Sequence, residues 1–183
     1  MLSTTDFLME FLKPLHTYIN DECSRGSLRY VQEKFAKVSM RNCLSNLYTK
    51  FRSAKDEGPR MIIGSLTSEE ESIDTLMHII VAQNIGWDVT YVGNSVPHDE
   101  MTYMANKIKA STIVVALNNP SDVARKTYEI KTMKELADLK DNIVLIGTQA
   151  NTYRQIADDV NAVVSQDLSS FRLTLERLYG LIR

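Results

Sequence analysis

The residues that could do chemistry gather in one stretch of the sequence, Gly64 to Leu76. Three consecutive glutamates, Glu69 to Glu71, follow the apolar run at residues 61–63, and Asp74 comes three residues after the last of them. Carboxylates at the start of a helix interact with the positive end of its dipole, and they repel a bound anion from the same place. One interpretation is a solvated first helical turn with Ser68 as its cap. The other is a ligand site built from carboxylates.

Other catalytic or metal-binding groups do not emerge from the sequence. The three histidines, His16, His78 and His98, lack the three- or four-residue spacing that places two ligands on one helical face. Cys23 and Cys43 stand alone, which favours free thiols over a disulfide or a zinc site. A nucleophile elbow or a Ser-His-Asp arrangement cannot be argued. The sequence therefore predicts a protein that is not an enzyme.

The elements that would position the carboxylates are short runs rich in Val and Ile, separated by longer segments of helical period. These runs span residues 61–65, 88–93, 111–117, 142–147 and 161–165. Strands as uniformly apolar as these are covered on both faces. We therefore predict an α/β fold: a parallel, doubly wound sheet of five strands, flavodoxin-like or Rossmann-like, with an N-terminal helical cap. Ligands of such sheets lie beyond the carboxyl ends of the strands, where the glutamates are.

A helical unit precedes the predicted sheet. Behind the predicted helix cap Ser3, apolar residues recur at helical spacing from Phe7 to Leu15, and they do so again from Val31 to Phe51. The pattern lapses over residues 53–60, which contain a Gly-Pro pair. We predict a helical cap or dimerisation segment at residues 1–57 and an α/β domain at residues 58–183. Two helices cannot bury both of their apolar faces alone, so we expect a homodimer through this segment.

The composition argues against several classes of partner. The chain of 183 residues has 21 basic and 23 acidic side chains and a formal net charge of -2, which gives no overall attraction to nucleic acid or anionic lipid. Its apolar runs are far shorter than the ~20 residues of a membrane-spanning helix, and its first residues lack the order of a signal peptide. We expect a cytoplasmic protein that binds neither nucleic acid nor membranes and that acts on a protein partner.

Three common uses of this fold disagree with the loops at the strand ends. A dinucleotide enzyme needs Gly-x-Gly-x-x-Gly, but Gly64 is followed by three residues that are not glycine. A flavin phosphate would meet the field of the glutamates, although nearby hydroxyls keep a flavin-binding module open as an alternative. A phosphoaccepting receiver domain requires an Asp after the third strand, where Asn118 and Asn119 stand.

Several features in order along the chain resemble the cobalamin-binding domain family. That family has Asp-x-His-x-x-Gly after the first strand, Leu-Gly and Val-Pro after the second, Ser-x-Leu after the third and Gly-Gly after the fourth. The segment Tyr91 to Pro97, "YVGNSVP", resembles the second feature. The segment at residues 27–44 is similar to the helix that caps cobalamin in light regulators of the MerR type and in corrinoid methyltransfer proteins. In the first signature, the resemblance places Glu69 at the Asp, Glu71 at the His and Asp74 at the Gly. In the third, it places Ala116 at the Ser and Asn118 at the Leu. Gly147 and Thr148 stand at the Gly pair after the fourth strand.

The resemblance implies the family fold with a degenerate cofactor motif. In the family, the His coordinates cobalt, and the Gly and Ser positions leave room for the nucleotide tail of the cofactor. Here Glu71 lacks the imidazole nitrogen, and Asp74 would place a carboxylate beside the phosphate of that tail. We therefore predict that no cofactor is bound, with cobalamin or haem as alternatives, and that the protein's own side chains form no metal site.

The predicted function is that of a cytoplasmic, non-catalytic sensory or regulatory domain of the cobalamin-binding-like fold. It would act by binding a protein in transcriptional, stress or light signalling, without His-ligated cobalamin. The first alternative is a cobalamin- or corrinoid-binding photoreceptor or methyltransfer carrier. The second is a sensor that binds haem or flavin.

Overall fold

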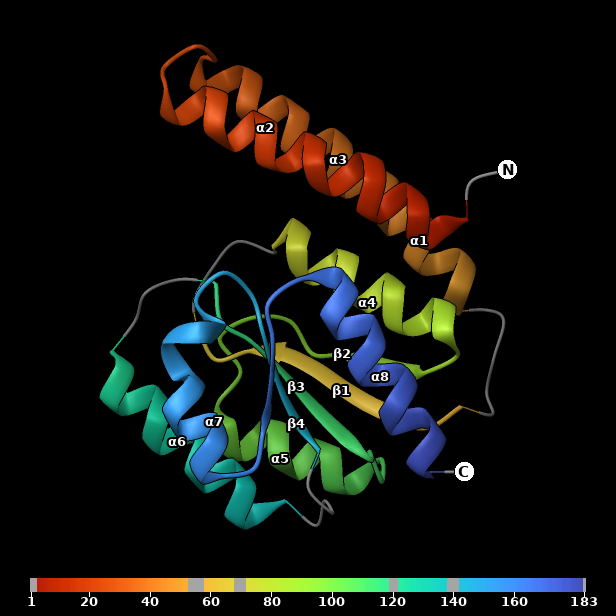
Figure 1. Cartoon of the computed structure of the whole chain (residues 1–183), viewed down its shortest axis with the longest axis vertical. Coiled ribbons are helices and arrows are strands. Elements are labelled where there is room, and N and C mark those ends of the chain that lie inside the picture. The colour runs from red at the N-terminus through yellow and green to blue at the C-terminus, as the bar shows by residue number, and fades with distance from the viewer. Residues whose placement is uncertain (1–2, 53–57, 68–71, 119–121, 138–141, 183) are drawn as a thin grey trace.

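The computed structural model describes residues 3–52, 58–67, 72–118, 122–137 and 142–182. A helical hairpin comes first in the chain, and a sheet with helices on both faces follows it (Figure 1). In chain order the elements are α1 (Thr4–Asp6), η1 (Phe7–Leu12), α2 (Lys13–Ser24), α3 (Tyr30–Arg52), β1 (Arg60–Ser65), α4 (Ile73–Ile85), β2 (Asp88–Tyr91), α5 (His98–Lys107), β3 (Thr112–Ala116), α6 (Val123–Leu136), β4 (Ile143–Ile146), η2 (Ala150–Tyr153), α7 (Arg154–Asp159), β5 (Val163–Ser165) and α8 (Leu168–Ile182).

The five strands form one parallel sheet in the order β2-β1-β3-β4-β5. Helices α4 and α8 cover one face, and α5, α6 and α7 cover the other (Figure 1). This confirms the prediction of a five-stranded, doubly wound α/β sheet with an N-terminal helical cap. The chain reverses its direction of travel across the sheet between β1 and β3, so a crevice at the carboxyl ends of these two strands is the expected ligand position.

The hairpin begins at a capping box and lies against α4. The Ser3 hydroxyl accepts a hydrogen bond from the Asp6 N–H, and the Asp6 carboxylate accepts one from the Ser3 N–H, which confirms the predicted cap. The segment before Pro14, Phe7–Leu12, is π-helical. Pro14 has no N–H to donate to the preceding turn, which favours such a departure from the regular α-helix. Met40 and Leu44 of α3 are buried in the same apolar cluster as α4. The helical hairpin therefore contributes to the apolar core on the α4 side of the sheet.

Helix α4 is buried on almost every side, because it lies between the sheet, α3 and α8 (Figure 1). Its N-cap is Ser72, whose hydroxyl accepts a hydrogen bond from the Thr75 N–H, and it ends at Gly86 with a left-handed φ of 109°. The expected cap Ser68 lies outside the described residues. Polar side chains on α4 are consequently held in a dry environment.

The predicted division of the chain at residue 57 falls in a segment outside the described residues, between the end of α3 at Arg52 and the start of β1 at Arg60. It stays a prediction. Each of the described helices falls short of the length or the hydrophobicity that crossing a bilayer demands.

Candidate functional site

The ends of β3 and β4 bring four of the predicted site residues together. Ala116 is buried, and its carbonyl accepts a hydrogen bond of 3.0 Å from the Ser65 hydroxyl of β1. The Thr148 hydroxyl donates to the carbonyl of Asn118 at 2.9 Å. Gly147 has a φ of 106°, and a β-carbon there would lie 2.5 Å from Asn118 Oδ1. The loops after β3 and β4 are therefore in direct contact, and the glycine permits that approach.

Polar side chains in the first turns of α4 lie next to the loop after β3. We call Thr75, His78 and Asn118 the polar floor. Asn118 Nδ2 donates to the Thr75 hydroxyl at 3.4 Å, and His78 lies one turn after Thr75 on the same helical side. His78 Nδ1 lies 2.7 Å from the carbonyl oxygen of Asp74. A carbonyl can only accept, so Nδ1 carries the proton and Nε2 is left with a lone pair. Phe171 of α8 packs its ring edge against the imidazole, with the centroids 4.9 Å apart.

Two atoms of the polar floor are buried acceptors without a protein partner. Within the described part of the chain, His78 Nε2 and Asn118 Oδ1 have no hydrogen-bond donor. Burial lowers the pKa of His78 and outweighs its bond to the Asp74 carbonyl, so the ring is neutral at neutral pH. A buried acceptor without a donor costs about 1–3 kcal/mol. A ligand that brings N–H or O–H groups to this place would remove that cost.

Asp74 lies next to the polar floor, but its carboxylate faces the hairpin. Its Oδ1 lies 2.6 Å from Lys13 Nζ and 3.7 Å from His16 Nδ1, both on α2. Burial acts to raise the pKa of Asp74, but the bonds from His16 and Lys13 outweigh it and hold the pKa well below its usual range. The charge of Asp74 is thus compensated by α2. The other two predicted carboxylates, Glu69 and Glu71, lie outside the described residues.

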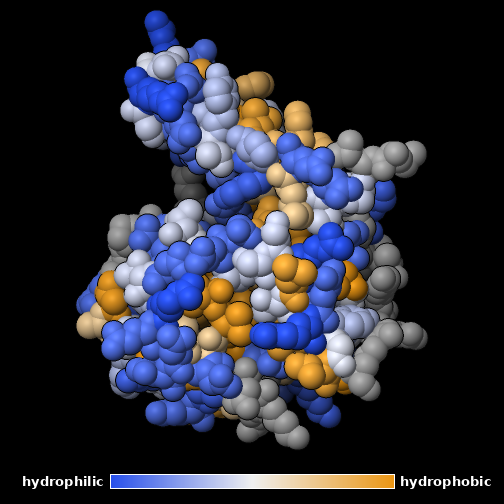
Figure 2. Space-filling model, viewed as in Figure 1, coloured by the Kyte–Doolittle hydropathy of each residue, from blue (hydrophilic) through white to orange (hydrophobic). Residues whose placement is uncertain are grey.

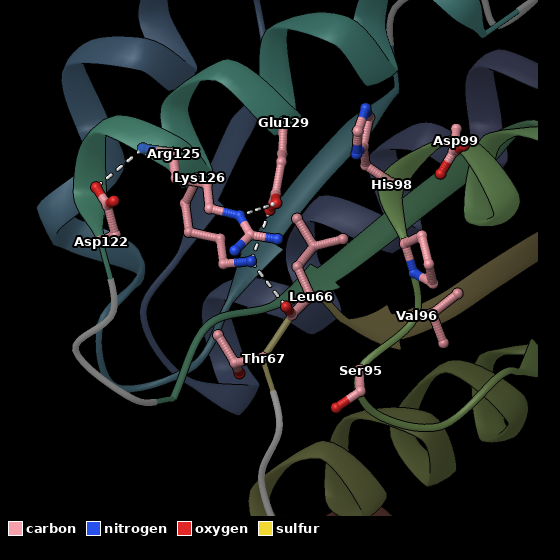
Figure 3. A pocket seen from close by; sticks show the side chains of 11 residues that line it. Leu66, Thr67, Ser95, Val96, His98, Asp99, Asp122, Arg125, Lys126 and Glu129 are labelled. Atoms are coloured by element: carbon pink, nitrogen blue, oxygen red, sulfur yellow. Dashed lines mark hydrogen bonds and ion pairs between the residues drawn. The ribbon is translucent and has the colours of Figure 1, made fainter.

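A cavity of about 540 Å³ lies on the other side of the strand ends, between the loops after β1 and β2 and the start of α6 (Figure 3). The buried Lys126 donates to the Leu66 carbonyl at 2.7 Å and to Glu129 Oε2 at 2.6 Å. Arg125 Nε donates to Glu129 Oε1 at 2.9 Å, and Asp122 caps α6. Thr67, Ser95, Val96, Pro97, His98 and Asp99 line the rest of the cavity.

The residues that sequence reasoning missed differ in how they could have been found. Lys126 and Arg125 stand three and four residues before Glu129 on one helix, a spacing that predicts their ion pairs. The pair of Lys13 with Asp74 joins residues 61 positions apart, and no local pattern announces it. Among the described residues, no group of three or more His, Cys, Asp or Glu side chains could hold a metal ion.

No protein-family model and no curated protein matches the sequence. Solved structures of similar fold do match. The monomethylamine corrinoid protein of Methanosarcina barkeri aligns with a TM-score of 0.73 at 14% identity, over 96% of this chain and 84% of its own. The chain has the fold of cobalamin-binding domains.

Two further structures with the cobalamin-binding fold support this assignment. A cobalamin-binding protein from Desulfitobacterium hafniense DCB-2 aligns with a TM-score of 0.56 at 12% identity, over 94% of each chain. The methanol:cobalamin methyltransferase complex of Methanosarcina barkeri aligns with a TM-score of 0.58 at 13% identity, over 96% of this chain and 67% of that chain.

These neighbours contradict the prediction that no cofactor is bound, because each is named for a corrinoid or cobalamin. The physical reason for the error lies at Asp74. The prediction placed its carboxylate against the phosphate of a cofactor tail, whereas the carboxylate contacts Lys13 of the hairpin. A charge that is already paired repels a phosphate far less than a bare one does.

Proposed function

We propose that this protein is a non-catalytic sensory or regulatory domain that binds a corrinoid at the carboxyl ends of its strands and acts on a protein partner. The fold supports the proposal over almost the whole chain, including the hairpin. The observation that carries it is the pair of buried acceptors without a donor among the described residues, His78 Nε2 and Asn118 Oδ1, which belong to the polar floor after β1 and β3. The family resemblance places the cofactor tail between β1 and β3, and Asn118 follows β3 closely.

The chemistry of these residues suits the periphery of a corrinoid. The macrocycle carries carboxamide groups, and its nucleotide tail carries ribose hydroxyls, so the ligand brings the donors that His78 and Asn118 lack. A β-carbon at residue 147 would lie 2.5 Å from Asn118 Oδ1, so the glycine leaves room for this side-chain amide. When bound, the corrinoid would supply a cobalt ion with exchangeable axial positions. The residues of this chain would bind and orient it.

Coordination of the cobalt is where this chain departs from the family pattern. The resemblance places Glu71 at the position of the cobalt-coordinating His. Without an imidazole nitrogen from that loop, the ligand field below the metal differs. We therefore propose a corrinoid held by the polar floor and the crevice, without His ligation from the loop between β1 and α4.

A protein partner is the proposed recipient of the signal. One structural neighbour is a methyltransferase complex, which supports the use of this fold in protein assemblies. A domain with a bound cofactor and no catalytic group of its own must pass its state to another molecule by contact.

Incubation of the purified protein with hydroxocobalamin, followed by gel filtration, tests the proposal. We expect the wild-type protein to elute with a corrinoid absorption spectrum. His78→Phe keeps a ring against Phe171 but removes the acceptor, and it should weaken retention about tenfold. Leu181→Ala, at the opposite end of α8, is the control and should bind like the wild type. A wild-type protein that elutes without corrinoid would overturn the proposal.

A further inference from the structure

The outward face of α3 carries no charge over most of the helix. Between residues 31 and 49, all of which the structure describes, every exposed side chain is uncharged. They are Val31, Gln32, Phe35, Val38, Ser39, Asn42, Ser45, Asn46 and Thr49. A helix face that meets only water normally carries charged side chains, and 24% of this chain is charged. Depletion of charge, together with exposed aromatic and aliphatic side chains, is the composition of an interface core.

The charged residues of the same segment point elsewhere. Glu33, Lys34, Lys37 and Arg41 are all partly buried on the flanks of α3. Glu33 accepts hydrogen bonds from Lys37 Nζ at 2.5 Å and from the Cys23 thiol of α2 at 2.9 Å. The bond between Glu33 and Cys23 joins the two arms of the hairpin. The exposed side chains of α3 are therefore uncharged from residue 31 to residue 49, and Lys50 is the first exposed charge after them.

The spacing of the face is that of a coiled-coil seam. Val31, Phe35, Val38, Asn42, Ser45 and Thr49 follow one another at alternating steps of four and three residues. This heptad spacing keeps a stripe of side chains facing a second helix that runs alongside. Val31 is 68% exposed, Phe35 75% and Val38 49%. Large apolar side chains at heptad spacing are thus exposed to water in the N-terminal half of α3.

The polar half of the seam is suited to burial. The Ser39 hydroxyl donates to the Phe35 carbonyl, and the Thr49 hydroxyl donates to the Ser45 carbonyl, each at 3.0 Å. Hydroxyls bonded within their own helix lose little when water is removed. Asn42 stands at a seam position where an asparagine is known to fix the register of two paired helices. The seam therefore has an apolar end, with Val31, Phe35 and Val38, and an uncharged polar end, with Asn42, Ser45 and Thr49.

The hairpin is also self-complementary in charge. Residues 3–24 hold Asp6, Glu10, Asp21 and Glu22 against Lys13, and residues 29–41 hold Arg29, Lys34, Lys37 and Arg41 against Glu33, so the two segments carry net charges of -3 and +3. A two-fold axis that sets one hairpin on another brings the basic flanks of α3 toward the acidic arm of the second copy.

We propose that α3 packs along its uncharged face against α3 of a second copy of this chain, so that two hairpins form a four-helix bundle. The hairpin lies at the outside of the molecule, with α4 between it and the sheet (Figure 1). Hydrophobic side chains reach the surface of the hairpin on the side away from the sheet (Figure 2). A stable interface of standard size buries roughly 800 Å² per partner, which is the area that this face and its flanks would have to supply.

Sedimentation equilibrium of the protein without added corrinoid tests this interface separately from the proposed function. We expect a dimer for the wild type. Phe35→Glu puts a charge in the seam and should raise the dimer dissociation constant about 30-fold or more. Val38→Glu should act in the same direction. The matched control is Leu173→Glu on α8, where the wild-type side chain is 66% exposed, and it should leave the dimer intact.

Circular dichroism of each variant confirms that the helices are retained. A wild-type protein that stays monomeric at about 100 µM would overturn the proposal, even if α3 then binds a different protein. So would a dimer that tolerates both seam variants, or one that only Leu173→Glu dissociates.

Discussion

The two sides of the strand ends differ in how their polar groups are satisfied. On the α6 side, the cavity of about 540 Å³ is lined by charged groups that pair with one another, Lys126 and Arg125 with Glu129. On the α4 side, the polar floor is closely packed, yet His78 Nε2 and Asn118 Oδ1 have no donor among the described residues. The hollow on the α6 side is therefore held by internal ion pairs, whereas the closely packed α4 side has buried acceptors that a ligand could satisfy. In this molecule the unsatisfied hydrogen-bond acceptors and the cavity of about 540 Å³ lie in different places.

The largest effect is expected on the α6 side, from Glu129→Ala. This change leaves the ammonium of Lys126 buried without its carboxylate, and breaking such a pair from one side costs about 3 kcal/mol of unfolding free energy. Urea denaturation measures the loss. Arg125→Ala is the control, because its side chain is 72% exposed and its ion pair is screened, so the loss should stay below about 1 kcal/mol. Equal losses for the two variants would mean that the pair with Lys126 does not hold this side together.

A smaller effect is expected on the α4 side, from Gly147→Ala. The residue combines a φ of 106° with a contact of 2.5 Å between the added β-carbon and Asn118 Oδ1, so the substitution should cost about 2 kcal/mol. Gly93→Ala is matched for backbone strain, with a φ of 84°, but its β-carbon would meet no atom within 4 Å. It should cost about 1 kcal/mol. If both variants have the same melting temperature, then the loops after β3 and β4 can move apart to make room for a β-carbon at residue 147.

The fold could be predicted because its signals are local. Apolar runs such as Ile143–Ile146 have no polar alternation, so they indicate a strand covered on both faces, and the helical period between the runs supplies the covers. The parallel arrangement and the cap followed from that alternation together with the family resemblance. Each of these inferences depends on residues within a few positions of one another.

The candidate site could be predicted only in part. The positions at the ends of β3 and β4 follow from the topology, because carboxyl ends of parallel strands meet at one edge. The direction of the Asp74 side chain does not follow from it, since Lys13 reaches Asp74 across the interface between hairpin and sheet. His78 has an ordinary place on an apolar helix in the sequence, and only the packing of α4 against α8 shows that its Nε2 is buried without a donor.

The smallest effect is expected where the hairpin meets the polar floor, from Asp74→Asn. The pKa of Asp74 is lowered in the folded protein, so its charge stabilises the fold above the unfolded pKa of about 3.9, and that contribution is lost as the pH falls through the folded value. Lys13 is 36% exposed on its side chain, so the stabilisation is modest, about 1 kcal/mol at pH 6. The difference in unfolding free energy between wild type and Asp74→Asn should shrink as the pH falls below about 4. Urea titrations across this range measure the difference. A difference that did not shrink below about pH 4 would mean that the charge of Asp74 does not stabilise the fold and that the hairpin is held to α4 by apolar contacts alone.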